Sequence, residues 1–143
     1  MILNRKAKYD YHFLLEFEAG MILTGTEVKS LRLGNASISE SFIFMKGNKL
    51  FVKGMNISEY KGGDFGQHDP IRERELLLNK KELRDISKEL NDNGTTIVPL
   101  SVYMKNGKFK MKIAVVKGKK NYDKRNSIKD RDNKRELDRK YKV

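Results

Sequence analysis

The feature that most constrains the fold is a pair of extended segments joined by Asn106-Gly107. Residues 96–104 and 109–116 are rich in β-branched and other apolar side chains, as β-strands usually are. Asn-Gly between two such segments is the strongest short-range signal for a two-residue hairpin turn. The chain is therefore expected to contain a long antiparallel hairpin near its C-terminal end, and this favours an architecture built mainly of β-strands.

The returning segment of this hairpin carries a regular pattern of lysines. Lys108, Lys110 and Lys112 alternate with apolar residues, so they should share one face of the strand while the apolar residues face the core. Their ammonium groups would stand about 7 Å apart, a spacing that can follow the phosphates of an extended nucleic acid. The same pattern also protects an edge strand against aggregation, and the strand alone favours neither interpretation.

Other strands are predicted from shorter patterns. Residues 11–17 alternate with a period of two, which places Tyr11, Phe13, Leu15 and Phe17 on one face. Gly20 is expected to interrupt this strand, and residues 21–23 to resume it. Residues 46–49 read as a hairpin turn between 42–45 and 50–52, and residues 61–69 as a glycine-rich loop.

Two short helices are expected from their capping residues. Thr24 and Glu27 have the spacing of a capping box, and Gly34 marks the end of the first helix. Asn79 can cap a helix over residues 80–90 that Asn93-Gly94 terminates, with an apolar stripe formed by Leu83, Ile86 and Leu90. With five or six antiparallel strands and two or three short helices, the pattern favours a small closed or nearly closed barrel of the oligonucleotide-binding type. A β-sandwich is the alternative.

The charge predicts a polyanionic partner. The 143 residues carry a net charge of +12, which suggests nucleic acid first and an anionic membrane surface second. The chain has no cysteine and only two histidines without metal-binding spacing, so neither a metal site, a cofactor nor an enzymatic activity is expected. No apolar run is long enough to cross a membrane and no signal peptide is evident, so we expect a soluble, cytoplasmic protein.

Most of this charge lies in a C-terminal tail. Residues 117–143 contain eight Lys and four Arg against four Asp and one Glu, a net charge of +7. They contain too few apolar residues to build a core. We therefore expect a barrel over residues 1–118 and a basic tail over residues 119–143 that is disordered alone and helical on a partner. A purely solubilising tail is the alternative.

A second basic cluster lies at the N-terminus. Arg5, Lys6 and Lys8 lead into Tyr9 and Tyr11. Cations interleaved with aromatic rings suit contact with phosphates and stacking on bases. A frayed, solvated terminus would show the same composition.

Several motifs occur in the order typical of one family. They are residues 16–20 (EFEAG), 25–32 (GTEVKSLR), 68–70 (HDP), 76–79 (LLLN) and 118–125 (GKKNYDKR). Together they resemble the SsrA-binding proteins, also called small protein B, and the resemblance runs from about Asn4 to the C-terminus. It implies an oligonucleotide-binding-type barrel that holds the tRNA-like domain of transfer-messenger RNA. With elongation factor Tu, such a protein enters stalled ribosomes, where its tail becomes a helix in the empty mRNA channel.

The resemblance also assigns candidate residues by position. Glu18, Leu77 and Lys110 match family residues that bind the RNA, although Leu77 could equally be a core residue. Asn4, Arg5 and Tyr9 match an entry segment in which many members have His at the position of Tyr9. The remaining candidate RNA contacts are Lys6, Lys108, Lys112, Lys119 and Lys120, and the candidate ribosome-binding residues of the tail are Tyr122, Asp123, Lys124, Arg125, Lys129 and Arg131.

Two other functions remain open at this stage. A general binder of single-stranded nucleic acid would need only a basic surface with aromatic residues. A tail that binds a membrane surface would need a broad apolar face, and its five scattered apolar residues do not supply one.

Overall fold

The structure is a computed structural model that describes residues 1–60, 68–92 and 94–118. The expectations for the loop at 61–67 and for the tail at 119–143 lie outside the described residues, as does Asn93. The last described strand runs to Gly118, which is also the last described residue.

Nine strands and three helices make up the described part of the chain. The strands are β1 (Ile2–Leu3), β2 (Tyr11–Met21), β3 (Ala36–Ser37), β4 (Phe42–Lys46), β5 (Lys49–Lys53), β6 (Asn56–Ile57), β7 (Arg74–Leu77), β8 (Thr95–Lys105) and β9 (Lys108–Gly118). The helices are α1 (Ala7–Asp10), α2 (Gly25–Arg32) and α3 (Lys80–Leu90).

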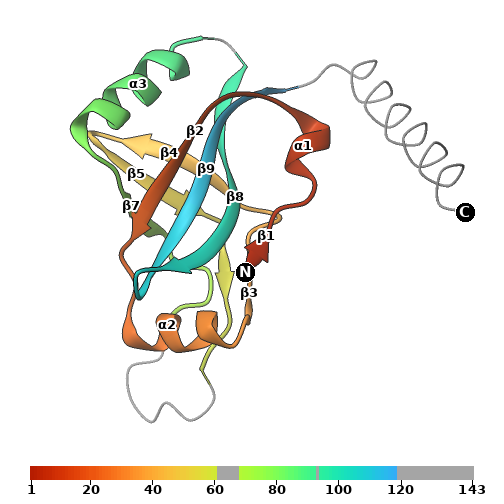
Figure 1. The fold of residues 1–143 in the computed structure, drawn as a ribbon, viewed down its shortest axis with the longest axis vertical. Coiled ribbons are helices and arrows are strands. Elements are labelled where there is room, and N and C mark those ends of the chain that lie inside the picture. Colours follow the sequence, from red (N-terminus) through yellow and green to blue (C-terminus); the bar gives the residue numbers. More distant parts are fainter. Residues whose placement is uncertain (61–67, 93, 119–143) are drawn as a thin grey trace, which may run out of the picture.

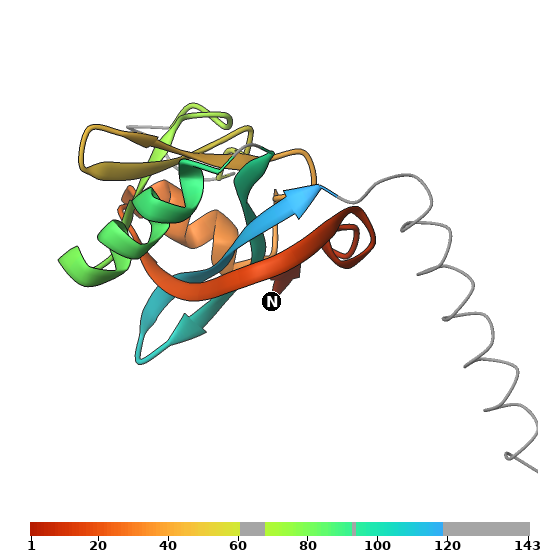
Figure 2. The ribbon, with the colours of Figure 1, turned by 90° about the horizontal axis from the view of Figure 1, so that it is seen from above.

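Six of the strands close into an antiparallel barrel. The order β8-β4-β5-β7-β2-β9 returns to its start because β9 also pairs with β8. β1 pairs with β8 further along, at Ser101 and Val102. Figures 1 and 2 show β2, β9 and β8 on one side and the β4–β5 hairpin on the other, with α2 and α3 near the two ends. The predicted barrel is confirmed, and the alternative of a sandwich is wrong.

The interior of the barrel is filled by aliphatic side chains from every strand of the ring. Completely buried members include Leu50, Val52, Ile97, Met111 and Ile113. Ile86 brings α3 into the same cluster, with Leu83 and Leu90 half-buried beside it, as the predicted stripe requires. Both longer helices begin with the predicted capping boxes, Thr24 with Glu27 and Asn79 with Glu82.

The C-terminal hairpin also follows the prediction. Asn106 and Gly107 both have positive φ, 53° and 77°, and Lys105 pairs directly with Lys108. These angles fit the type I′ turn that Asn-Gly favours, because the backbone twist of that turn matches the twist of the strands. The turn fixes the register that sends Met111 and Ile113 into the core.

The prediction of one uninterrupted alternating face for residues 11–17 is wrong. The register of β2 against β9 shifts between Phe13 and Leu15, so a bulge forms there. Leu15 and Phe17 pack against the barrel core, whereas Tyr11 and Phe13 join a separate cluster outside it with Ala114 and Val116. The α1 residue Ala7 is buried in this outer cluster, so the N-terminal segment covers this half of the sheet.

Two further expectations need correction. Gly20 does not interrupt β2, which continues to Met21, while Ile22 and Leu23 lie beyond the strand. The expected five or six strands are too few for the described residues, because β7 and the two-residue strands β1, β3 and β6 lack a pattern of their own. β7 holds its place through pairing with β5 and β2, which sequence periodicity does not reveal.

A buried ion pair joins α2 to β7. Arg74 and Glu27 are both completely buried, and the Arg74 Nε donates to Glu27 Oε2 at 2.5 Å. The other Arg74 nitrogens donate to the carbonyl oxygens of Met55, Asp69 and Pro70 at 2.6, 3.2 and 3.1 Å. Arg72 donates to the second Glu27 oxygen at 2.6 Å. Every part of this pair thus finds a partner, as a buried charge requires.

His68 and Thr26 complete the same junction. The Thr26 hydroxyl lies 2.8 Å from His68 Nδ1, and His68 Nε2 lies 2.7 Å from the carbonyl oxygen of Ile57. A carbonyl can only accept, so the ring carries a proton on Nε2 and can accept from the Thr26 hydroxyl on Nδ1. Two of the motif segments, 25–32 and 68–70, therefore meet in a structural role.

The first prediction concerns acid stability. Burial raises the pKa of Glu27, but hydrogen bonds from Arg72, the Thr24 amide and Arg74 outweigh it and hold the pKa at about 2, against an ordinary value of 4.5. A carboxyl whose pKa is lowered by folding stabilises the protein above its unfolded pKa and stops doing so as it becomes protonated. We expect the free energy of unfolding to fall as the pH drops from about 4.5 to about 2, measured by urea titration at several pH values.

The variant Glu27→Gln tests the assignment. It leaves Arg74 buried without its counter-charge, so we expect a loss of about 3–5 kcal/mol at neutral pH and a flatter acid profile. The exposed Glu73→Gln provides a matched control with wild-type behaviour. A Glu27→Gln protein with the stability and acid profile of the wild type would contradict this account.

Candidate nucleic-acid interface

The lysine row lies on the outside of the barrel, on the face formed by β2, β9 and β8. Lys108 and Lys112 are exposed and Lys110 is half-buried, whereas the alternating residues Met111 and Ile113 face the core. β9 is not an edge strand, because it pairs with β2 on one side and β8 on the other. The edge-protection interpretation of these lysines is therefore wrong.

Carboxylates from β2 interleave with these lysines. Lys112 Nζ lies 3.3 Å from Glu16 Oε2. Glu18 pairs across β9 with Lys105 of β8, whose Nζ lies 3.3 Å from Glu18 Oε1. The surface is thus a mixed array in which Lys105, Lys108, Lys110 and Lys112 outnumber Glu16 and Glu18. The sequence predicted the lysines but not the carboxylates between them.

Tyr103 fixes the position of Glu18. The Tyr103 hydroxyl donates a hydrogen bond to Glu18 Oε2. That bond lowers the pKa of Glu18; the smaller effect of desolvation opposes it, and Lys105 and Lys110 lower it further. Desolvation and the same bond raise the pKa of Tyr103 to about 12. At neutral pH, Glu18 is therefore an ionised acceptor held in one orientation.

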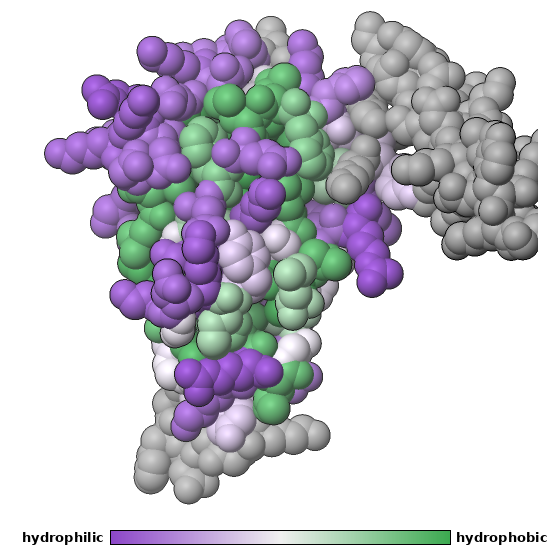
Figure 3. All heavy atoms as spheres, viewed as in Figure 1, coloured by the Kyte–Doolittle hydropathy of each residue, from purple (hydrophilic) through white to green (hydrophobic). Residues whose placement is uncertain are grey.

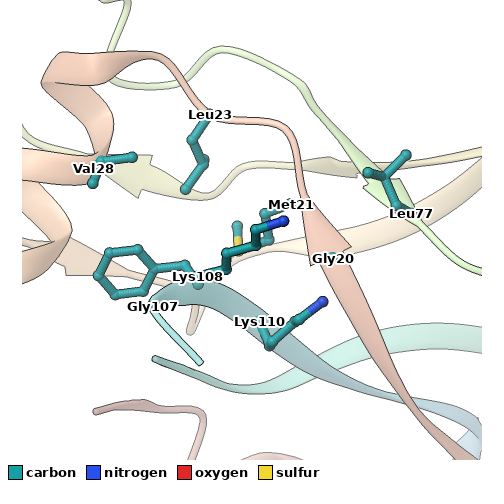
Figure 4. A pocket seen from close by; sticks show the side chains of 9 residues that line it. Gly20, Met21, Leu23, Val28, Leu77, Gly107, Lys108 and Lys110 are labelled. Carbon is teal, nitrogen blue, oxygen red and sulfur yellow. The ribbon is translucent and has the colours of Figure 1, made fainter. Parts of the chain in front are cut away.

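A hollow of about 430 Å³ opens beside this array, where β2, β7 and the β8–β9 turn meet. Figure 4 shows Leu77 and Lys110 on either side of the β2 ribbon at Gly20, with Lys108 further along β9. A Cβ at Gly20 would lie 3.4 Å from Leu77 Cβ and 3.7 Å from Lys110 Nζ. The absence of a side chain at Gly20 keeps this hollow open between an apolar and a cationic group.

Leu77 is therefore a surface residue. Its side chain is 53% exposed, whereas its neighbour Leu76 is 2% exposed and belongs to the core. The alternation along β7 sends one leucine inward and the next outward. The structure thus brings Glu18, Leu77 and Lys110, which are far apart in the sequence, to one end of the same outer face.

A second hollow, of about 440 Å³, lies beside the N-terminal segment. Asn4 and Arg5 line it together with Glu16 and Lys112, so it adjoins the charged array. The Asn4 amide group donates to the Pro99 carbonyl at 2.9 Å, and its backbone N–H donates to the Leu100 carbonyl at 2.8 Å. Asn4 thus anchors the N-terminal segment to β8, a role that its RNA-binding assignment did not anticipate.

The other N-terminal candidates lie at α1. Lys6 is exposed at the N-terminal end of this helix, and Tyr9 is half-buried within it. α1 covers the apolar half of the β2–β9–β8 face, next to the charged array. The candidates outside the described residues are Lys119, Lys120, Tyr122, Asp123, Lys124, Arg125, Lys129 and Arg131.

Four residues of this surface were not predicted as site residues from the sequence: Glu16, Gly20, Tyr103 and Lys105. Glu18 and Tyr103 are 85 residues apart, and only the pairing of both strands with β9 brings them together. Only Lys105 could have been found from a local pattern. The turn at Asn106-Gly107 places it directly opposite Lys108, and so next to the lysine row.

The surface is neither uniformly polar nor uniformly basic. Figure 3 shows hydrophobic surface along the face of β2, β8 and β9, interrupted by separate hydrophilic side chains. Among the described residues, no cluster of His, Asp or Glu could hold a metal ion. No described helix is long and apolar enough to span a membrane.

These features define a small antiparallel barrel of the oligonucleotide-binding type, with lysines, an oriented carboxylate and apolar contacts on one outer face. Comparison with known proteins makes the relationship specific. The model of the family described as SmpB protein matches residues 1–143, and the chain belongs to this family.

Individual relatives agree with this assignment. The SsrA-binding protein of Flavobacterium psychrophilum is 51% identical over 139 residues, covering 96% of this chain and 93% of the relative. That of Acetivibrio thermocellus is 46% identical, covering 97% and 90%. A solved structure described as "tmRNA-SmpB: a journey to the center of the bacterial ribosome" contains a similar chain with a TM-score of 0.69 and 39% identity, covering 84% of this chain and 85% of that one.

The second prediction tests the orientation of Glu18. Tyr103→Phe removes the hydrogen bond that lowers the pKa of Glu18 most, so we expect that pKa to move up towards its ordinary value. Carboxyl-resolved NMR titration of the Glu18 signal measures it. Tyr11→Phe, which removes a hydroxyl from the other end of β2, is the control. An unchanged Glu18 titration in Tyr103→Phe would mean that Tyr103 does not hold the carboxylate.

Proposed function

We propose that this protein binds the tRNA-like domain of transfer-messenger RNA and delivers it to ribosomes stalled without downstream mRNA. It acts as a non-catalytic adaptor in the cytoplasm. Its delivery of the RNA leads to rescue of the ribosome and to tagging of the incomplete protein for proteolysis. The observation that carries the proposal is the match of the whole chain to the SmpB family, in a fold that brings Glu18, Leu77 and Lys110 together.

The chemistry of the array suits a folded RNA. Lys108, Lys110 and Lys112 can contact phosphates without reading sequence. Glu18, ionised and held by Tyr103, can accept hydrogen bonds from base edges or a ribose hydroxyl. The exposed side chain of Leu77 can pack on a sugar or base beside the hollow at Gly20. The carboxylates disfavour indiscriminate binding of phosphates, because a poorly placed phosphate meets Glu16 or Glu18.

The tail provides the second half of the proposed function. Its net charge of +7 from residue 117 onwards suits a polyanionic groove. We infer that it folds as a helix in the empty mRNA channel, with Tyr122, Asp123, Lys124 and Arg125 near the decoding centre. Lys129 and Arg131 would lie further along the channel. Bound mRNA excludes the tail sterically, and elongation factor Tu joins the barrel and the RNA in the incoming complex.

The direct test is to recover the RNA that the protein carries. The tagged protein is purified from its own bacterium at about 0.3 M salt, which weakens nonspecific phosphate contacts, and the bound RNA is sequenced. We expect strong enrichment of one RNA with a tRNA-like end. A spread of ribosomal and messenger fragments would instead support a general binder of single-stranded nucleic acid.

The third prediction concerns the array. Lys110→Ala should weaken binding of transfer-messenger RNA several-fold. It should also reduce the magnitude of the salt slope, the change of log affinity with log salt concentration, by about one. Lys81→Ala, which removes an exposed lysine from α3, is the matched control and should change neither. Equal effects of the two substitutions in a filter-binding salt series would contradict a specific role for Lys110.

The fourth prediction separates the barrel from the tail. Replacing Asp123, Lys124 and Arg125 together by Ala should leave the affinity for transfer-messenger RNA nearly unchanged and abolish tagging. Binding is measured with the purified RNA and tagging in a reconstituted translation reaction that contains stalled ribosomes. Parallel loss of both activities would contradict the proposed division between residues 1–118 and 119–143.

A further inference from the structure

We propose that the outer face of the β4–β5 hairpin is a second RNA-binding surface, where an unpaired base stacks on Phe42 and lysines at both ends hold its phosphates. This goes beyond the proposed function, which uses the β2–β9–β8 face and the tail. The surface consists of a phenylalanine ladder, formed by Phe42, Phe44 and Phe51, and of Lys46, Lys49 and Lys53.

The phenylalanine ladder lies outside the core. Ile43 and Met45 of β4 and Leu50 and Val52 of β5 pack into the barrel, so the alternating residues point outward. None of the three phenylalanines belongs to either hydrophobic cluster of the described residues. Phe42 is 46% exposed. An aromatic side chain that is not needed by the core and remains exposed is a candidate contact.

The rings support one another. Phe44 and Phe51 pair directly across the strands with centroids 5.8 Å apart and an interplanar angle of 25°, a stacked arrangement. Phe42 follows at 6.3 Å from Phe44, tilted by 47°. The Phe44–Phe51 pair stabilises the hairpin and limits the movement of Phe42. The rigid, exposed ring that results can accept a base without losing much side-chain freedom on binding.

Cations stand at both ends of the ladder. Lys53 lies directly opposite Phe42, and Lys46 lies opposite Lys49 at the turn. Lys49 pairs with Glu75 of β7 at 3.3 Å, whereas Lys46 and Lys53 make no ion pair with any residue of the described part. Proteins that bind single-stranded nucleic acids combine aromatic rings, on which the bases stack, with cations that contact the phosphates.

The positive charge of this surface disfavours a second copy of the chain as its partner. A second copy of the chain would bring its own lysines against these, and like charges across an interface are unfavourable. The lysines favour an anionic partner, and the rings favour one with flat apolar faces. An unpaired RNA segment has both properties.

The surface is independent of the first one. In the ring of six strands, β4 and β5 lie opposite β2 and β9, and Figure 2 shows the hairpin on the far side of the barrel from them. Both faces can therefore be occupied at once. A barrel with two such faces can join two RNA segments rather than cover one.

The test is an NMR titration of the full-length protein, labelled in its phenylalanine rings, with a single-stranded octamer of uridine. We expect the signals of Phe42, Phe44 and Phe51 to shift along one binding curve. Phe42→Leu, followed through Phe51, should weaken that curve at least about fivefold, because it removes the stacking partner but keeps an apolar side chain. Phe42→Tyr, which retains the ring, should remain within about twofold of the wild type.

Further measurements make the result decisive. Lys53→Ala should reduce the magnitude of the salt slope of the same curve by about 0.7, the value for one phosphate on a single strand. RNA that saturates the protein while the ladder signals stay fixed overturns the proposal, since binding then occurs elsewhere. Ladder signals that shift with protein concentration alone overturn it in favour of self-association. Thermal melting confirms that each variant is folded.

Discussion

The buried pair of Glu27 and Arg74 is the interaction on which the rest of the structure depends. One guanidinium group holds α2 through Glu27, the segment between β5 and β6 through the Met55 carbonyl, and the chain that leads into β7 through the carbonyls of Asp69 and Pro70. β7 in turn pairs with β5 and β2 and completes the ring. Without Arg74, α2 and β7 would lose their common anchor, and the hollow between Leu77 and Lys110 would lose one wall.

The two ends of the β2–β9–β8 face have different chemistry, and β9 explains why. Its outward residues are Lys108, Lys110 and Lys112 at one end and Ala114 and Val116 at the other. The bulge in β2, which lies opposite Val115 and Val116, turns Tyr11 and Phe13 outward to cover the apolar end. α1 and the segment anchored by Asn4 cover this apolar end. The N-terminal segment therefore leaves the charged end open beside it.

Local signals could be predicted from the sequence, and long-range ones could not. The Asn106-Gly107 turn, the two capping boxes and the alternation along β9 are set by neighbouring residues, and all were found. The β2 bulge, β7 and the Tyr103–Glu18 bond depend on strands that meet only after the barrel closes. The resemblance supplied Glu18, Leu77 and Lys110 without their geometry, and the structure adds that Leu77 is exposed and that Tyr103 holds Glu18.

β9 also sets the distance between two functional points of the proposed mechanism. Lys110 lies in the charged array, and Gly118, the last described residue, follows eight positions later on the same strand, which is paired on both sides. At about 3.3 Å per residue, the strand sets these two points about 26 Å apart. An insertion or deletion within it would break the registers with β2 and β8 and empty part of the core. The proposed RNA contact at Lys110 and the start of the proposed tail are therefore held a fixed distance apart by the same hydrogen bonds that hold the barrel closed.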